Sequence, residues 1–247
     1  MTKTNVRMVV AYDGTDYLGW QKTKTGKSIE ETLGSALQQI LREEVALQAA
    51  SRTDRGVHAQ GQVVNFFSPT DDLTLIERGV NAVLPKSISV KSVEIAAPSF
   101  HPTLDATGKE YQYFLCPTAI QLPFHRNFSW HLQTPLEIEK MKRSAEQLVG
   151  KKDFSAFCNA GTHNKRTGIC TLREISFTPI EDDRLKIAII GDNFLYKMVR
   201  NLVGTLVYVG MGKIKNEELP SILEGRDRTR AGITAPAHGL VLQQVFY

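Results

Sequence analysis

In the first hundred positions, segments with the hydrophobic pattern of a strand alternate with segments that have the pattern of a helix. The order of these segments restricts the possible folds. Short apolar runs of strand length alternate with longer segments in which apolar residues recur on one helical face. Ser28 and Glu31 have the spacing of a capping box at the start of the first helix. The order β-α-β-β-α-β predicts a sheet flanked by two helices. In the chain the segments are residues 8–12 (strand), 29–41 (helix), 45–50 (strand), 63–67 (strand), 73–84 (helix) and 88–95 (strand).

The second half of the chain shows a similar mixture after a change of composition at residues 97–102. We predict an α+β fold of two domains, residues 1–100 and 101–247, with largely antiparallel sheets, helices outside and a cleft between them. The segments are residues 111–115 (strand), 134–150 (helix), 172–177 and 185–189 (strands joined by a turn at 181–183), 194–212 (buried helix) and 240–247 (strand).

A charged segment, residues 51–60, separates two apolar runs of the first domain. Loops carried on a rigid scaffold often display reactive groups, and Asp54 is the candidate here. If the segment is extended, Arg52 and Asp54 share a face, and the guanidinium would keep the carboxylate ionised. An ionised carboxylate can act as a nucleophile or a general base. An Asx turn, or a purely structural ion pair with Arg52, explains the same residues equally well. His58 could make a polar contact in a site. The better interpretation is that it lies in a turn and that its side chain hydrogen-bonds to the backbone.

The composition is that of an ordinary globular protein, with 42% hydrophobic and 23% charged residues among 247. The net charge of +4 favours polyanions only weakly. Three cysteines without a C-x-x-C pair argue against a disulfide framework or a zinc site. No stretch approaches the roughly 18 apolar residues of a membrane span, so we expect a soluble cytoplasmic protein. Basic loop residues that could contact an anion, or be merely solvated, are Lys22, Lys24, Lys27, Lys151, Lys152, Lys165, Arg166, Arg226, Arg228 and Arg230.

The run Arg52-Thr53-Asp54-x-Gly56-Val57-His58 resembles the active-site signature of the TruA family of tRNA pseudouridine synthases. Further motifs resemble the same family in the same order, and together they span almost the whole chain. They are Tyr12-Asp13-Gly14-Thr15, Gly19-Trp20-Gln21, Asn81 with Leu84-Pro85, Phe100-His101, Tyr111-x-Tyr113, Asp153-Phe154-x-x-Phe157, Met198-Val199-Arg200-Asn201-x-Val203-Gly204 and Thr234-Ala235-Pro236-x-x-Gly239-Leu240.

The resemblance implies the ferredoxin-like pseudouridine synthase fold and a homodimer that acts on tRNA. The implied reaction converts uridine to pseudouridine at positions 38, 39 and/or 40 of the anticodon stem-loop. Asp54 would be the catalytic aspartate, which attacks the ribose of a flipped-out uridine or takes a proton from it. The N1–C1′ bond breaks and the uracil rejoins through C5, so no cofactor or metal is needed.

The resemblance also implies roles for three substrate-binding residues. Tyr111 would pack on the target base, although by itself it reads as a core tyrosine. Arg52 would take the place of the flipped nucleotide in the stack. Arg200 would lie close to the catalytic aspartate, and we predict that it pairs with Asp54, because an arginine in an apolar helix is costly to bury alone.

The chain departs from the family pattern at three places. Ser51 replaces a glycine, Arg55 replaces an alanine, and Pro102-Thr103 stand where Ala-Arg is common. None of these changes removes a reacting group. Arg55 adds a positive charge that the pattern does not explain, and the absence of an arginine at 103 predicts one weaker RNA contact.

Two other functions fit parts of the sequence. One is an RNA-binding protein without turnover, which the presence of Asp54, Tyr111 and Arg200 disfavours. The other is a glycosyl hydrolase that uses Asp54, which would normally need a second carboxylate. Glu110 is the nearest candidate, but in a regular strand its side chain faces away from Tyr111.

Overall fold

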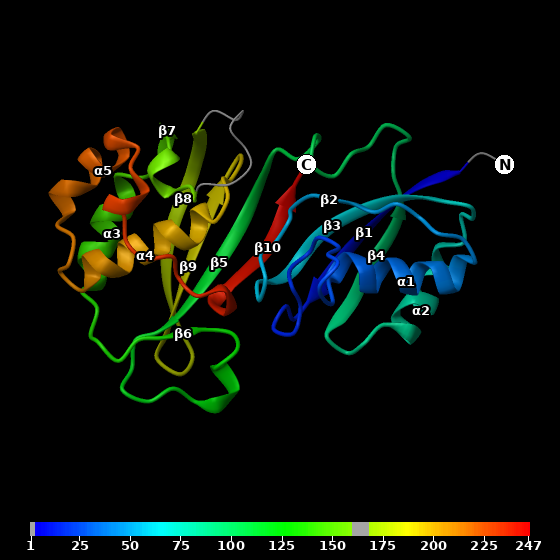
Figure 1. Cartoon of the computed structure of the whole chain (residues 1–247), viewed down its shortest axis with the longest axis horizontal. Coiled ribbons are helices and arrows are strands. Elements are labelled where there is room, and N and C mark those ends of the chain that lie inside the picture. Colours follow the sequence, from blue (N-terminus) through cyan, green and yellow to red (C-terminus); the bar gives the residue numbers. More distant parts are fainter. Residues whose placement is uncertain (1–2, 160–167) are drawn as a thin grey trace. The chain divides into compact units, whose positions relative to one another are not determined.

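A computed structural model of the chain describes residues 3–159 and 168–247 (Figure 1). Two of the basic residues named above, Lys165 and Arg166, lie outside the described residues. The chain forms two compact units. Unit 1 comprises Met1–Thr107 and Val241–Tyr247, and unit 2 comprises Gly108–Leu240. The functional domains 1–100 and 101–247 and the cleft between them stay predictions.

Unit 1 contains a mostly antiparallel sheet and two helices, in the predicted order. The strand order is β4-β1-β3-β10, with the short β2 also paired to β3. Strand β1 is antiparallel to both β3 and β4, whereas β10 runs parallel to β3. The elements are β1 (Thr4–Tyr12), α1 (Ile29–Leu41), β2 (Gln48–Ala49), β3 (His58–Ser68), α2 (Leu73–Val83), β4 (Ile88–Ile95) and β10 (Leu240–Phe246).

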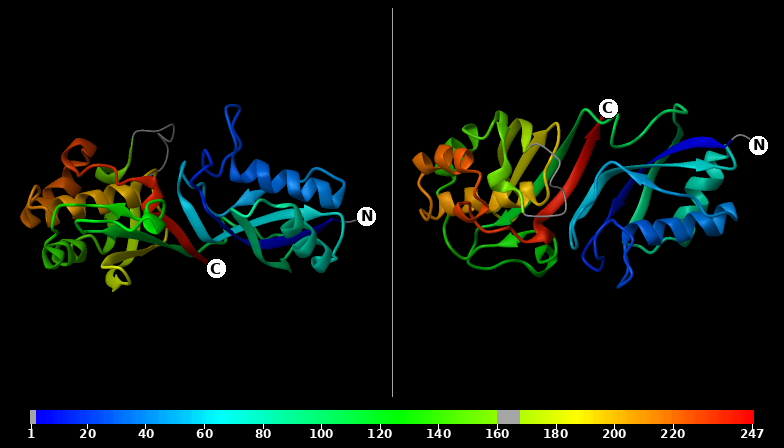
Figure 2. Two further views of the ribbon diagram at one scale, coloured as in Figure 1. Left: turned by 90° about the horizontal axis from the view of Figure 1, so that it is seen from below. Right: turned by 45° about the horizontal axis from the view of Figure 1, so that its top comes forward.

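The core of unit 1 includes the face of the sheet on which the buried residues of β1 pair with buried residues of β3. Val10 faces Gln62, Met8 faces Val64 and Val6 faces Phe66, and all of these side chains are buried. Helix α1 runs along the sheet (Figure 2) and packs beside α2. The predicted capping box is confirmed at its first bond, since Ser28 Oγ accepts from the Glu31 N–H at 3.2 Å.

One strand of unit 1 is much shorter than predicted. The sequence favours a strand over residues 45–50, but β2 contains only Gln48–Ala49. Ala50 still donates from its N–H to the Val63 carbonyl at 2.9 Å, and the chain then leaves β3. Small apolar residues in a segment predict that it is buried. How many of them pair as a strand depends on the course of the neighbouring strand, here β3.

Unit 2 has an antiparallel sheet in the order β5-β9-β8-β7, with β6 parallel to β5. Helices α3 and α4 pack against each other, and Figure 1 shows α5 next to them. The elements are β5 (Gly108–Cys116), η1 (Pro123–His125), β6 (Trp130–His131), α3 (Ile138–Glu146), β7 (Gly150–Asp153), η2 (Ser155–Phe157), β8 (Ile169–Ile180), β9 (Arg184–Gly191), α4 (Met198–Gly210), η3 (Asn216–Glu218), α5 (Leu219–Gly225), η4 (Arg228–Arg230) and η5 (Ala237–Gly239).

The predicted α+β class is confirmed, but several elements of unit 2 differ from the prediction. The helix expected over residues 134–150 forms only at Ile138–Glu146, and neither β6 nor α5 was predicted. The buried helix begins at Met198 and not at 194, because Lys197 adopts a left-handed backbone (φ 59°). Strand β7 was not predicted, since Lys151 and Lys152 give it no apolar pattern. None of the helices among the described residues is long and apolar enough to cross a membrane.

Candidate active site

Asp54 begins a tight turn between β2 and β3. The N–H of Val57 donates to the carbonyl of Asp54 at 3.1 Å, so Arg55 and Gly56 occupy the corner. Gly56 has a φ of 76°, which suits the third position of a type II turn and favours glycine there. The predicted loop is confirmed, but it ends at Val57, three residues before the end of the segment 51–60, because β3 begins at His58 and not at 63.

The segment of residues 13–20 packs directly on this turn. Trp20 donates from its N–H to the Thr53 carbonyl at 3.0 Å. A Cβ at Gly19, whose φ is 100°, would lie 2.6 Å from the Thr53 oxygen, and one at Gly14 would lie 2.0 Å from the Val57 oxygen. The two backbones touch where these glycines stand. The resemblance motifs Asp13-Gly14 and Gly19-Trp20 are therefore the surface against which the Asp54 turn is held.

Three buried polar side chains hold the start of the turn from the other side. The amide of Gln62 donates from Nε2 to the Ser51 carbonyl at 2.6 Å and accepts from the Ser51 N–H at 3.2 Å. The hydroxyls of Tyr12 and Thr53 lie 2.8 Å apart. Gln62, Tyr12 and Thr53 are 0%, 4% and 7% exposed. Sequence reasoning missed Gln62; its only signal is an amide directly before the apolar pair Val63-Val64 of β3.

The side chains of the turn differ in exposure. Asp54 is partly buried, whereas Arg52 and Arg55 are exposed. The bonds at Ser51, Thr53 and Val57 fix the backbone on both sides of Asp54, and a nucleophile or base needs a rigid scaffold of this kind. An ion pair between Arg52 and Asp54 stays a prediction, and nothing in the turn explains Arg55.

His58 has a structural role: it is bonded to backbone, as predicted, but it lies in β3 and not in the turn. Its Nδ1 lies 3.0 Å from the backbone nitrogen of Gly14 and 3.1 Å from Oδ1 of Asp13. A backbone N–H can only donate, so Nδ1 accepts from Gly14 and carries no proton. Asp13 Oδ1 instead accepts from the N–H and the hydroxyl of Thr15, at 3.0 and 2.6 Å. His58 thus ties residues 13–15 to the first residue of β3.

Thr103, which stands where the family pattern has an arginine, makes hydrogen bonds within unit 1. The Thr103 hydroxyl donates to the carbonyl of Ala49, the last residue of β2, at 2.8 Å. The N–H of Thr103 donates to Nδ1 of His101 at 3.1 Å. Thr103 therefore supports the strand that leads into the Asp54 turn.

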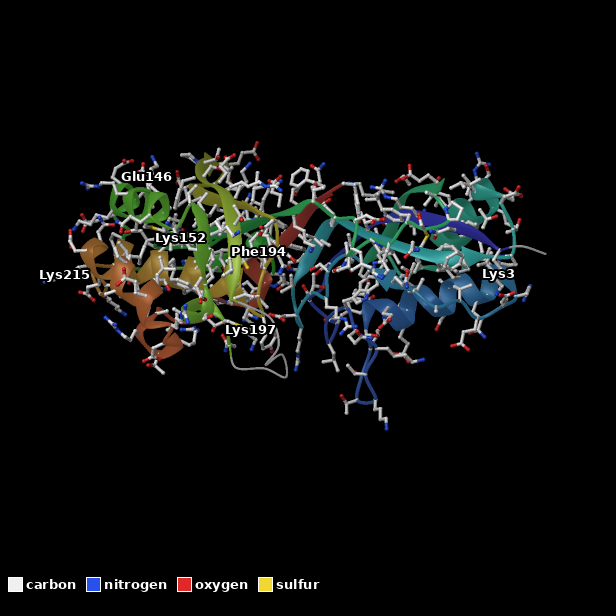
Figure 3. All side chains as sticks on the ribbon, turned by 90° about the horizontal axis from the view of Figure 1, so that it is seen from above. Lys3, Glu146, Lys152, Phe194, Lys197 and Lys215 are labelled. Carbon is white, nitrogen blue, oxygen red and sulfur yellow. The ribbon has the colours of Figure 1, made fainter. Side chains whose placement is uncertain are left out.

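In unit 2, Tyr111 lies on β5 opposite Ile189 of β9 and is 7% exposed. The rings of Tyr111 and Phe194 form a T-shaped pair, with an angle of 83° between their planes and 5.1 Å between their centroids. Phe194 belongs to the segment between β9 and α4 (Figure 3). Glu110, one residue away, accepts from Gln112 Nε2 at 2.7 Å on the other face of the strand. Glu110 is therefore turned away from Tyr111, which weakens the hydrolase alternative.

Arg200 lies on the first turn of α4 and is bonded to the backbone of Ala235. Its Nε donates to the Ala235 carbonyl at 2.7 Å, and the Ala235 N–H donates to the Arg200 carbonyl at 3.1 Å. A Cβ at Gly204 would lie 1.7 Å from the Ile233 oxygen, so the helix and this segment touch backbone to backbone. The structure thus joins the two resemblance motifs at 198–204 and 234–240. The pairing of Arg200 with Asp54 stays a prediction.

Asn201 is the centre of a buried polar network in unit 2. Its Nδ2 donates to the Phe157 carbonyl and to Oδ1 of Asn159, both at 2.7 Å. Its Oδ1 accepts from Arg228 Nη2 at 2.8 Å and from the Thr234 hydroxyl at 2.7 Å. One amide therefore connects α4 to three distant segments.

The basic run near the end of the chain serves unit 2 itself. Burial lowers the pKa of Arg228, whose guanidinium also donates from Nη1 to the Gly232 carbonyl at 2.8 Å. Arg226 pairs with Asp153 at 2.9 Å, and Arg230 donates to the hydroxyl of Ser221 at 3.0 Å. Alternating arginines in a loop suggested contacts with an anion, but Arg228 has its donors engaged inside the unit.

Comparison with known proteins identifies the family. A family model described as tRNA pseudouridine synthase matches residues 8–103 and 144–247. The protein named tRNA pseudouridine synthase A 2 from Protochlamydia amoebophila (strain UWE25) is 48% identical over 247 residues, covering 98% of this chain and 94% of that protein. The tRNA pseudouridine synthase A of Thermoanaerobacter sp. (strain X514) is 44% identical over 244 residues, covering 98% and 99%. The chain belongs to the tRNA pseudouridine synthase family and is an isomerase.

Proposed function

We propose that this protein converts uridine to pseudouridine at positions 38, 39 and/or 40 in the anticodon stem-loop of tRNAs, with Asp54 as the catalytic carboxylate on a flipped-out nucleotide. Membership of the family supports the reaction. The observation that carries the assignment of Asp54 is its place on a turn whose backbone is bonded on both sides. A carboxyl group held in this way needs little reorganisation before it reacts.

The reaction is balanced without any oxidant or added group. The N1–C1′ bond of uridine breaks, a C5–C1′ bond forms, the hydrogen on C5 leaves as a proton and N1 takes up a proton. Two routes have this outcome: the carboxylate of Asp54 adds to C1′, or it removes the proton at C2′. Both start from the ionised carboxylate, and both need the detached uracil to be held while it turns.

Three further residues complete the proposal. Extruding a nucleotide costs a few kcal/mol, and the exposed guanidinium of Arg52 would take its place in the stack. The ring of Tyr111 would pack on the uracil, because an aromatic face holds a base in many orientations. Arg200 would pair with Asp54 and favour its charged form. We also propose that the protein acts as a homodimer in the cytoplasm and uses no cofactor.

The test follows tritium released from C5 of uridine in unmodified tRNA transcripts, without added metal. Wild-type protein should release tritium, and Asp54→Asn should release none. Asp71→Asn, at an exposed carboxylate of the same unit, is the matched control and should keep the wild-type rate. Retained activity in Asp54→Asn would overturn the role of Asp54.

The target positions are tested with transcripts that carry uridine at only one of positions 38, 39 and 40. Release is expected from at least one of these transcripts. Undiminished release from a transcript with cytidine at all three positions would contradict the proposed site.

A further inference from the structure

Gln62 continues the ladder between β2 and β3 with its side chain. Gln48 pairs with Asn65 and Ala49 with Val64, and the Ala50 N–H bonds the Val63 carbonyl. The next step of an antiparallel ladder would bring Ser51 to Gln62. At that step the Gln62 amide binds both the N–H and the carbonyl of Ser51, at 3.2 and 2.6 Å. The chain is thus held at the point where it leaves the sheet.

An irregularity in β3 accompanies this arrangement. Val10 of β1 pairs with Gln62, but Tyr12 pairs with Ala59, so β3 contains one additional residue between these pairs. Bulges of this kind redirect neighbouring side chains and occur next to active sites. Here the Tyr12 hydroxyl lies 3.4 Å from Gln62 Nε2 and 2.8 Å from the Thr53 hydroxyl. The network therefore reaches from the sheet to the residue before Asp54.

We propose that Gln62 is a positioning residue for the reaction, acting on the Asp54 carboxylate through Ser51 and through the Tyr12–Thr53 pair. The inference rests on the proposed catalytic role of Asp54. Serving both backbone groups of Ser51 requires one donor and one acceptor at the end of a long side chain. Glutamine supplies both, whereas a carboxylate can only accept and methionine supplies neither to any useful extent.

Asn65 provides a matched control on the same strand. Its amide is also completely buried, and it donates to Asn5 Oδ1 at 2.8 Å and to the Phe100 carbonyl at 3.3 Å. These partners lie outside the Asp54 turn. Gln62→Met and Asn65→Leu therefore each remove one buried amide from β3, but only the first change touches the turn.

The experiment compares these variants in the full chain by three measurements: thermal melting, tRNA affinity, and the single-turnover rate of tritium release from bound tRNA. Misplacement of a catalytic group by about 1 Å costs on the order of 100-fold in rate. Gln62→Met should lose rate by about that factor while its tRNA affinity is unchanged. Asn65→Leu should melt earlier than wild type but react at the wild-type rate.

Milder variants decide the question if Gln62→Met does not fold. Tyr12→Phe and Thr53→Val each remove one hydroxyl of the network, and both should slow the single turnover, whereas Thr53→Ser should restore the rate. Equal rates in Gln62→Met and Asn65→Leu would overturn the inference, as would wild-type rates in both milder variants. A wild-type rate in Asp54→Asn would instead overturn the proposed function itself.

Discussion

The hydroxyl of Tyr113 donates to the carbonyl of Pro236 at 2.8 Å, across 123 positions of sequence. The Tyr113 ring is fully buried against Gly239, where a Cβ would lie 2.6 Å from ring carbon Cζ. Burial raises the pKa of Tyr113 well above its usual value, although the charge of Arg200 acts in the opposite direction. The hydroxyl therefore stays protonated and remains a donor. Two separate resemblance motifs, Tyr111-x-Tyr113 and 234–240, meet in this one contact.

Replacing Tyr113 by phenylalanine should lower the free energy of unfolding by about 1–2 kcal/mol, because the Pro236 carbonyl loses its donor in a buried place. Urea denaturation of Tyr113→Phe measures the change. Tyr208→Phe is the control, since Tyr208 is only partly buried and Lys213 Nζ lies over its ring, 4.9 Å from the ring centroid. Equal losses in the two variants would show that the Pro236 bond contributes nothing specific.

Alanine at position 19 should destabilise unit 1 and slow the reaction together. The backbone there has a φ of 100°, and the new Cβ would meet the Thr53 oxygen at 2.6 Å. Such strain costs about 1–3 kcal/mol, or displaces the Asp54 turn to relieve it. Gly34→Ala, in α1 with its nearest neighbour at 3.9 Å, should instead stabilise the protein by about 0.5–1 kcal/mol. If Gly19→Ala had the wild-type free energy of unfolding and the wild-type rate of tritium release, the backbone contact would be contradicted.

Asp192 should contribute stability that disappears in acid. Burial raises the pKa of Asp192, whereas hydrogen bonds from Thr171 and Asn193 and the charge of Arg173 lower it. The lowering effects together outweigh the effect of burial, so the pKa lies below its ordinary value. A carboxyl group with a depressed folded pKa stabilises the protein above its unfolded pKa of about 4 and loses this contribution as the pH falls through the folded value.

The measurement for Asp192 is the free energy of unfolding of wild type and Asp192→Asn between neutral pH and about pH 3. Asp192→Asn should be less stable than wild type at neutral pH, and the difference should narrow as the pH falls toward the folded pKa of Asp192. The amide keeps an oxygen that can accept from the Thr171 N–H, which bonds Asp192 Oδ1 at 2.8 Å, so this bond is retained while the charge is removed. A gap that is the same at both ends of the range would contradict the prediction.

Salt dependence of tRNA binding should separate the two kinds of arginine. Arg52 is exposed, and Arg52→Gln should reduce the slope of log affinity against log salt by about one, because one phosphate contact is lost. Arg228 donates within unit 2 to Asn201 and Thr234, so Arg228→Gln should lower the melting temperature without changing that slope. An unchanged slope for Arg52→Gln would place Arg52 outside the RNA contact.

The order of elements could be predicted because hydrophobic period is a local property. Strand or helix follows from how often an apolar side chain returns to the same face, and Ser28 caps α1 through a residue only three positions away. The ends were less predictable. Helix α4 begins four residues later than expected, at Met198, because a left-handed Lys197 precedes it, and no pattern of apolar residues encodes that conformation.

The sequence by itself determined the class of fold, the loop that carries Asp54 and, through ordered motifs, the family. Only the tertiary structure decided which side chains support that loop, because hydrogen-bond partners such as Gln62 and Ser51 lie in different segments, and neither segment's residues encode their pairing. The same holds for Arg228 of η4, whose guanidinium donates to Asn201 and Thr234. The spacing of apolar residues predicts which side chains are buried. Which residue each of them contacts depends on the tertiary fold, because the partner can lie far away in the sequence.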